Sequence, residues 1–162
     1  MTFIRNALVL CCLLLVPASL FAQGASVAFG GIRQDTSKPV ELSADALSVD
    51  QDNNTAVFTG NVVIGQGEMR LGAQQVRVVY NQDQSRIRRL EATGGVTLVS
   101  GPDAAEAERA DYDIDSGVVV MSGNVLLTQG SNALTSDEMT VNLNTGAAQM
   151  QGRVKTILQQ QE

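Results

Sequence analysis

The chain has 162 residues, a net charge of −6 at pH 7 and no histidine, and its two cysteines, Cys11 and Cys12, lie in the first apolar run. Beyond that run, a Ser-His-Asp triad, a Cys-His pair and a zinc site made of Cys and His are therefore excluded. The acidic balance also argues against a nucleic-acid partner, because phosphate binding requires clustered positive charge.

The chain begins MTFIRNALVLCCLLLVPASLFAQ, in which one basic residue, Arg5, precedes an apolar run and small residues. This pattern is typical of a secretory signal peptide, and the run is shorter than the roughly 20 residues of a membrane-spanning helix. We predict a signal peptide over residues 1–22, with cleavage near Ala22 and Ala28 as the alternative. A lipoprotein signal would place a cysteine after the run. Residues 23–38, rich in Gly, Ala, Ser and Gln, are predicted to form a flexible arm.

Residues 39–158 repeat a two-part unit of roughly 29 residues four times. The first part reads LSADALSVD, LGAQQVRVV, AEAERADYD and LTSDEMTVN, and the second part is a run such as AVFTGNVVI. Turn-forming stretches such as QDNNT and NTG separate the two parts. We therefore predict one domain over residues 39–158 and a short tail over residues 159–162.

The second part of each unit alternates apolar and polar residues, which predicts antiparallel strands with one face on a core. In the first part, the parity of the apolar residues changes once per unit, at Val76, Ala110 and Met139. Such a change indicates a bulge or a strand that crosses a corner. The predicted fold is all-β and consists of stacked, bent antiparallel hairpins.

The inward positions of these strands are almost all apolar, so we expect them to line a groove. They offer apolar area and few directed hydrogen bonds, which suits fatty acyl chains because each buried methylene contributes about 0.8 kcal/mol. The predicted lipid-contacting residues are Phe58, Val62, Ile64, Val76, Val78, Val96, Leu98, Tyr112, Met121, Val125, Leu127, Met139, Val141 and Met150.

A glycine lies at the middle of each second part: Gly60, Gly94, Gly123 and Gly152. A residue without a side chain lets a strand bend and leaves empty volume, so these glycines are predicted to shape the groove. The alternative is that they only mark the corners of a fully packed β-sandwich.

Charged residues give weaker signals. Arg86, Arg88 and Arg89 flank a predicted turn, where they either face water or contact lipid phosphates. The acidic residues between Asp103 and Asp115 lack the D-x-D-x-D-G pattern of a calcium loop and are expected on an outward strand face. The sequence therefore predicts no catalytic residues, no metal and no cofactor, and the chain is not expected to be an enzyme.

The opening SADALSVDQDNNTAVFTGNVVI and the recurring x-G-N-V-x-aliphatic strands resemble the OstA-like family of periplasmic lipopolysaccharide-transport proteins. The resemblance covers residues 39–158. It implies a twisted, V-shaped antiparallel β-jellyroll that holds the acyl chains of lipid A between two sheets. In the last copy, Arg153 replaces Asn and Lys155 follows, and these charges are expected to limit pairing at the terminal edge.

The resemblance also implies partners. Lipopolysaccharide is the expected ligand, and an inner-membrane export component and an outer-membrane translocon are expected to pair with the strand edges. Head-to-tail self-association follows the same principle. The expected function is a periplasmic carrier or bridge between the two membranes. The alternatives are another component of the same pathway, which shares the fold, or an exported structural β-sandwich that carries no lipid.

Overall fold

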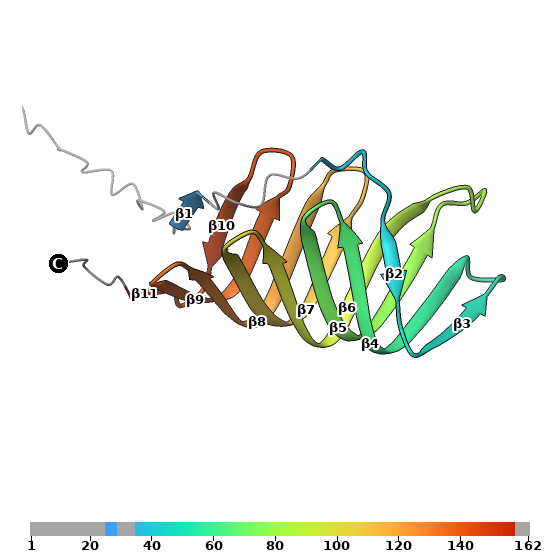
Figure 1. Cartoon of the computed structure of the whole chain (residues 1–162), viewed down its shortest axis with the longest axis horizontal. Helices are drawn as coiled ribbons and strands as arrows, with labels where there is room; N and C mark the ends of the chain where they lie inside the picture. The colour runs from blue at the N-terminus through green and yellow to red at the C-terminus, as the bar shows by residue number, and fades with distance from the viewer. Residues whose placement is uncertain (1–24, 29–34, 158–162) are drawn as a thin grey trace, which may run out of the picture.

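The computed structural model describes residues 25–28 and 35–157, and within them the chain forms one antiparallel sheet of 11 strands (Figure 1). The predicted signal peptide and the tail over residues 159–162 lie outside the described residues. Across the described part, no helix is long and apolar enough to span a bilayer. The strands are β1 (Ala25–Ala28), β2 (Glu41–Ser43), β3 (Ala46–Asp50), β4 (Thr55–Gln66), β5 (Met69–Tyr80), β6 (Ile87–Ser100), β7 (Asp103–Asp113), β8 (Val118–Gln129), β9 (Asn132–Asn142), β10 (Ala147–Gln151) and β11 (Lys155–Ile157).

The strand order is β1-β10-β9-β8-β7-β6-β5-β4-β2, while β3 also pairs with β4 and β11 also pairs with β9. Consecutive strands from β4 to β10 are therefore neighbours. The exception is at the start of the chain, where β1 and β2 follow one another in sequence but lie at opposite ends of the sheet (Figure 1).

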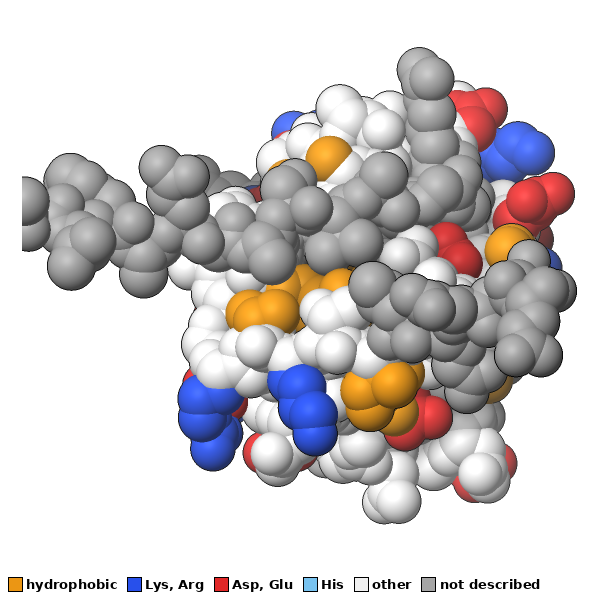
Figure 2. Space-filling model, turned by 90° about the vertical axis from the view of Figure 1, so that its left-hand side faces the viewer, with side chains coloured by type: hydrophobic (Ala, Val, Ile, Leu, Met, Phe, Trp, Pro, Cys, Tyr) orange, Lys and Arg blue, Asp and Glu red, His pale blue; other side chains and the backbone are white. Residues whose placement is uncertain are grey.

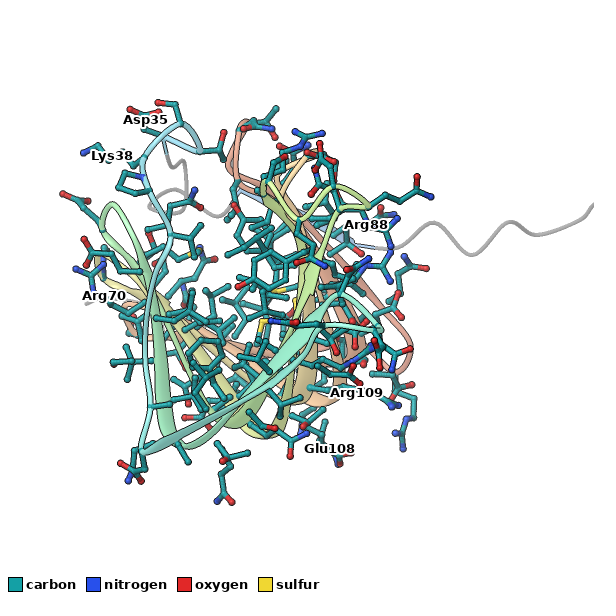
Figure 3. The ribbon with its side chains drawn as sticks, turned by 90° about the vertical axis from the view of Figure 1, so that its right-hand side faces the viewer. Asp35, Lys38, Arg70, Arg88, Glu108 and Arg109 are labelled. Atoms are coloured by element: carbon teal, nitrogen blue, oxygen red, sulfur yellow. The ribbon has the colours of Figure 1, made fainter. Side chains whose placement is uncertain are left out.

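The sheet is folded lengthwise into two walls that meet along a spine, so the molecule is V-shaped when viewed along the sheet (Figure 3). Strand β4 crosses the spine, because residues 55–59 pair with β3 and residues 63–65 pair with β2. We call the half that contains β2, β11 and Arg70 wall 1, and the half that contains β3, β10 and Arg88 wall 2. The predicted all-β, V-shaped antiparallel fold is confirmed.

A two-residue bulge turns β4, β6 and β8 at the spine, and the same pair of backbone conformations lies between β10 and β11. Gly60 and Asn61 in β4 have φ angles of 79° and 47°, and the pairing with β5 shifts between Thr59 and Val62. A left-handed backbone costs little for glycine and less for asparagine than for most other residues, which explains the recurring Gly-Asn. The other pairs with positive φ are Gly94–Gly95, Gly123–Asn124 and Gly152–Arg153.

The space beside the first glycine of each pair is occupied by a polar side chain of the neighbouring, preceding segment. A Cβ atom at Gly123 would lie 2.7 Å from Oε2 of Glu108, and one at Gly94 would lie 2.8 Å from Cβ of Gln74. A side chain in place of the first glycine of each pair would therefore meet a polar neighbour at the spine. That these glycines also shape the groove stays a prediction.

The second residue of the corner pair bonds to an acidic side chain on the preceding strand. Nδ2 of Asn61 donates to Oδ2 of Asp45 at 2.8 Å. In the last copy, Nε of Arg153 donates to Oδ1 of Asp137 at 2.9 Å, and this bond holds the pKa of Asp137 below its usual value. Arg153 thus takes the structural place of asparagine and is bound within its own chain.

The predicted parity changes are explained by the spine. On β7, Ala107 and Ala110 are both buried although they are three positions apart, because Glu108 and Arg109 lie between them at the apex of the V (Figure 3). On β5 and β9, the side chains of Val76 and Met139 point inward again after the strand has crossed the spine, and both are fully buried. The inward residues of both walls form one apolar cluster.

Candidate functional site

The candidate site is the lumen, which we define as the interior between the two walls. All predicted groove residues except Phe58 are at most 1% exposed, and they belong to the one apolar cluster. Phe58 is partly buried and packs against this cluster. The structure therefore brings the predicted residues together, and they pack against one another.

The lumen reaches the surface at the β3 end of the sheet. A cavity of about 220 Å³ lies there, between β3 and the start of β4, and Phe58 and Tyr80 line it. Leu47 and Val49 of β3 also line it and are 56% and 61% exposed. Large apolar side chains, of the kind usually buried in a core, are thus exposed to solvent at this edge.

The opposite end of the sheet also presents apolar side chains. Figure 2 views the molecule onto the end that carries β10 and β11, where hydrophobic side chains are visible between polar ones. Ile157 of β11 is 52% exposed and Val154 is 38% exposed. Within the described residues, β11 pairs only with β9, and β2 and β3 pair only with β4, so each end of the sheet offers unpaired backbone.

Further apolar residues of the lumen were missing from the predicted groove. Leu71 and Leu134 begin the first parts of their repeats, so the repeat pattern itself could have indicated them. Met69 and Leu143 lie just outside the predicted strands, because the repeat pattern did not define where each strand begins and ends. The buried residues in this group are Ala56, Met69, Leu71, Leu90, Ala92, Ala105, Ala107, Ala110, Val119, Leu134, Leu143 and Ala148.

Polar residues at the rim of wall 1 were also missed. Gln66 and Ser100 are the last residues of β4 and β6, and they are 1% and 0% exposed. The inward alternation at Val62 and Ile64 reaches Gln66 when it is extended by two residues, so the signal was present beyond the predicted strand end. Asp103 is buried as well, contrary to the outward face expected for the acidic residues.

The other acidic residues of this stretch lie on the outer side of the sheet or are half-buried. Glu106 and Glu108 are exposed, while Asp111 and Asp113 are half-buried. In the part of the chain that the structure describes, no group of three or more His, Cys, Asp or Glu residues could hold a metal ion.

Gln66 connects the two walls and the amino-terminal segment. The hydroxyl of Tyr112, in wall 2, donates to Oε1 of Gln66 at 2.6 Å. Nε2 of Gln66 donates to the carbonyl oxygens of Thr36 and Lys38 at 3.1 and 3.0 Å. Burial raises the pKa of Tyr112 to about 12, so its hydroxyl keeps the proton that it donates at neutral pH.

The described parts of residues 23–38 make backbone hydrogen bonds. Strand β1 pairs with β10 over its whole length. Residues 35–38 form a turn in which the amide of Lys38 donates to the carbonyl of Asp35 at 3.1 Å. The flexible arm expected over residues 23–38 stays a prediction.

The arginine cluster lies outside the lumen. Figure 3 shows Arg88 near the upper rim of wall 2 and directed away from the interior. Arg86 forms an ion pair with Asp115 at 2.9 Å. Hydrogen bonds from Ser116, followed by the charges of Arg89 and Arg88, hold the pKa of Asp113 below its usual value.

The fold and the site define an open, V-shaped β-jellyroll with an apolar interior and unpaired edges at both ends. Residues 41–147 match the family described as LptA/(LptD N-terminal domain) LPS transport protein, and the chain belongs to this family. Its members are components of lipopolysaccharide transport, so the chain is a transport protein and not an enzyme.

Relatives agree with this assignment. The chain is 28% identical to an uncharacterized protein of Rhizobium meliloti (strain 1021), with 91% of this chain and 85% of that protein aligned. It is 27% identical to the lipopolysaccharide export system protein LptA of Escherichia coli (strain K12), over 72% of this chain and 65% of LptA. It is 34% identical to the LPS-assembly protein LptD of Yersinia pseudotuberculosis, over 52% of this chain and 12% of LptD.

A solved structure has the same fold. The crystal structure of LptH, the LptA homologous periplasmic component of the lipopolysaccharide transport device of Pseudomonas aeruginosa, aligns with a TM-score of 0.70. The alignment covers 78% of this chain and 99% of that chain at 16% sequence identity. At this identity, the likeness shows the fold alone.

Proposed function

We propose that this protein is a periplasmic lipopolysaccharide carrier that shelters the acyl chains of lipid A between its two walls during transport from the inner to the outer membrane. One observation carries the proposal: a continuous apolar lumen runs along an open-edged sheet in a member of a lipopolysaccharide-transport family. The LptA relative of Escherichia coli, which is named as a lipopolysaccharide export system protein, supports the same assignment.

The energetics of the lumen support lipid as the ligand. Burial of one methylene contributes about 0.8 kcal/mol, so an acyl chain of about a dozen carbons gains on the order of 10 kcal/mol before ordering costs. Residues such as Leu98 and Met121 are fully buried in the apolar cluster. Acyl chains would therefore replace contacts between the walls, and the walls must part to admit them.

The partners that we propose are chains that add strands to the two ends of the sheet. The inner-membrane export component and the outer-membrane translocon would pair with unpaired backbone at β2 and β3 or at β11, and head-to-tail copies would join one end to the other. Exposed apolar residues at both ends, Leu47 and Val49 at one and Ile157 at the other, support such contacts.

We also propose that Arg88 and Arg89 contact phosphate groups of the lipid. Arg88 lies near the upper rim of wall 2, where a headgroup would emerge from the lumen (Figure 3). Arginine binds phosphate through charge-assisted hydrogen bonds. Arg86 is less suitable, because Asp115 already pairs with it.

Photocrosslinking tests the lumen directly. A small diazirine amino acid would replace Val62, Val96 or Val125, each 1% exposed, in separate variants. Matched controls would carry it at the exposed neighbours Asn61, Thr97 and Asn124. We expect lipopolysaccharide adducts from the buried set only. Equal labelling of both sets would contradict a binding site between the walls.

Two other functions give different outcomes. A structural exported β-sandwich would yield no lipopolysaccharide adduct at any position and no lipid in the purified protein. A role as a domain-like part of another pathway component is favoured by the 34% identity to LptD. In that case the protein would bind lipopolysaccharide but would fail to restore growth of a strain depleted of its LptA, whereas a carrier with the LptA role would restore it.

A further inference from the structure

A short strap crosses the open side of the V, opposite the spine. We define the strap as residues 35–40, which precede β2. Figure 3 shows Asp35 and Lys38 at the top of the V, far from Glu108 and Arg109 at its apex. The strap therefore lies where the two walls must separate if a ligand is to enter from the side.

The strap contacts both walls. In wall 1, Nε2 of Gln66 donates to the carbonyls of Thr36 and Lys38 at 3.1 and 3.0 Å. In wall 2, the hydroxyl of Thr36 donates to Oδ1 of Asn144, in the turn between β9 and β10, at 3.0 Å. Asn144 is fixed in turn, because its Nδ2 donates to the carbonyl of Ser116 at 3.0 Å.

Gln66 also joins the walls to each other. Its Oε1 accepts the hydroxyl of Tyr112 at 2.6 Å, across the lumen and 46 positions away in sequence. Both side chains are 1% exposed. A buried polar group that loses its hydrogen-bond partner costs free energy. The three hydrogen bonds of the Gln66 side-chain amide therefore form and break together more readily than one at a time.

The strap has a defined shape of its own. The amide of Ser37 donates to Oδ1 of Asp35 at 3.1 Å, and the hydroxyl of Ser37 donates to the same oxygen. These bonds hold the pKa of Asp35 below its usual value, so the turn keeps its charged cap at neutral pH. Val40, at the end of the strap, packs against the apolar cluster. The strap is thus a preformed piece that docks onto Gln66.

We infer that Gln66, Tyr112 and the strap form a latch that holds the two walls together on the open side of the V. Lipid enters from the side after Gln66 releases the carbonyls of Thr36 and Lys38 and the hydroxyl of Tyr112. The latch rests on the proposed function, because it regulates access of acyl chains to the lumen. Its location follows from the geometry, since walls that are continuous at the spine can open only on the opposite side.

The first test removes one bond of the latch and keeps the packing. Tyr112→Phe deletes the hydroxyl but retains the ring. Ser122→Ala is the matched control, because it deletes a hydroxyl that accepts a hydrogen bond from Nε of the exposed Arg109 at 3.0 Å, away from the lumen. We expect Tyr112→Phe to take up fluorescent lipopolysaccharide about three to ten times faster than the wild type, the factor that corresponds to one net hydrogen bond. Ser122→Ala is expected to load at the wild-type rate.

The second test locks the latch. The chain has no cysteine after Cys12, so Thr36→Cys with Asn144→Cys would place the only two thiols of the exported protein on the strap and on wall 2. Joining them by a disulfide or a short thiol cross-linker is expected to abolish lipopolysaccharide uptake, and cleavage of the link should restore it. Arg77→Cys with Glu91→Cys, which pair within wall 2, is the control that leaves uptake unchanged.

A lipid-free measurement separates failure of the latch from failure of the proposed function. Amide hydrogen exchange over residues 35–40 is expected to be faster in Tyr112→Phe than in the wild type or Ser122→Ala. If the wild type binds no lipopolysaccharide, the proposed function fails and hydrogen exchange still tests the closed latch. If the wild type binds lipopolysaccharide, equal uptake by wild-type, Tyr112→Phe and locked protein would overturn the latch, as would unchanged exchange in the strap.

Discussion

Gly123 and Glu108 meet at the spine so closely that a Cβ atom at Gly123 would lie 2.7 Å from Oε2 of Glu108. The same carboxylate accepts a hydrogen bond from Nδ2 of Asn124 at 2.6 Å. Gly123 also has a φ of +85°, where side chains other than glycine are strained. Position 123 therefore excludes a side chain for two independent reasons: its backbone conformation and the space that Glu108 occupies.

We expect Gly123→Ala to lower the free energy of unfolding by about 1–3 kcal/mol, the usual cost of a strained backbone, measured by urea denaturation. Gly72→Ala is the control, because nothing lies within 4 Å of a Cβ atom there and its φ is not in the left-handed region. The control should change stability by less than about 1 kcal/mol. Equal losses in the two variants would show that the corner has no special requirement for glycine.

Gly95 is a corner glycine whose replacement by asparagine is expected to stabilise the protein. It occupies the corner position that Asn61 and Asn124 hold in other repeats, its φ is +82°, and nothing lies within 4 Å of a Cβ atom. Asparagine tolerates a left-handed backbone, so Gly95→Asn is expected to raise the free energy of unfolding by about 0.5–1 kcal/mol by restricting the unfolded chain. Gly95→Val should lower it, because a β-branched residue is strained at this φ. A loss with both substitutions would contradict this reasoning.

Tyr112 should make stability sensitive to alkaline pH. Burial, followed by the charge of Asp113, raises its pKa from 10.0 to about 12, so folding favours the neutral phenol. This contribution to stability is complete below pH 10.0 and is lost as the pH rises toward about 12. In Tyr80→Phe, Tyr112 is the one remaining tyrosine, and its ionisation can be followed by ultraviolet absorbance. Ionisation near pH 10.0 in the folded variant would contradict a buried hydroxyl.

The β3 edge should control association. Val49 is 61% exposed on this edge strand, and a lysine on an edge strand disfavours pairing with another chain. We expect Val49→Lys to abolish head-to-tail oligomers in analytical ultracentrifugation. Val63→Lys is the control, because Val63 is 42% exposed but pairs with both neighbours of β4. Loss of oligomers with the control as well would place the contact elsewhere.

The arginine proposal is tested by affinity. We expect Arg88→Ala with Arg89→Ala to weaken lipopolysaccharide binding by about three- to tenfold, as expected for one or two charge-assisted hydrogen bonds. The effect should disappear with lipid that lacks phosphate. Arg77→Ala is the control, because Arg77 pairs with Glu91 at 3.0 Å. The same loss with phosphate-free lipid would rule out phosphate contact.

Much of the fold was determined by local pattern. The alternation around Val62 and Ile64 indicated which face is buried, because side chains of a strand point to opposite sides in turn. The parity change at Ala110 located the spine. The last copy seemed to break the pattern at Arg153, but its bond to Asp137 shows that a longer side chain can make the asparagine contact.

The sequence by itself determined the all-β class, the inward face and the places where strands bend, since these depend on residues that are neighbours along the chain. Only the tertiary structure decided that Glu108 fills the space beside Gly123, that Arg88 faces outward, and that Gln66 bonds to Tyr112 across the lumen. Those contacts join residues far apart in sequence. They depend on how the walls fold onto each other, which side-chain parity does not encode.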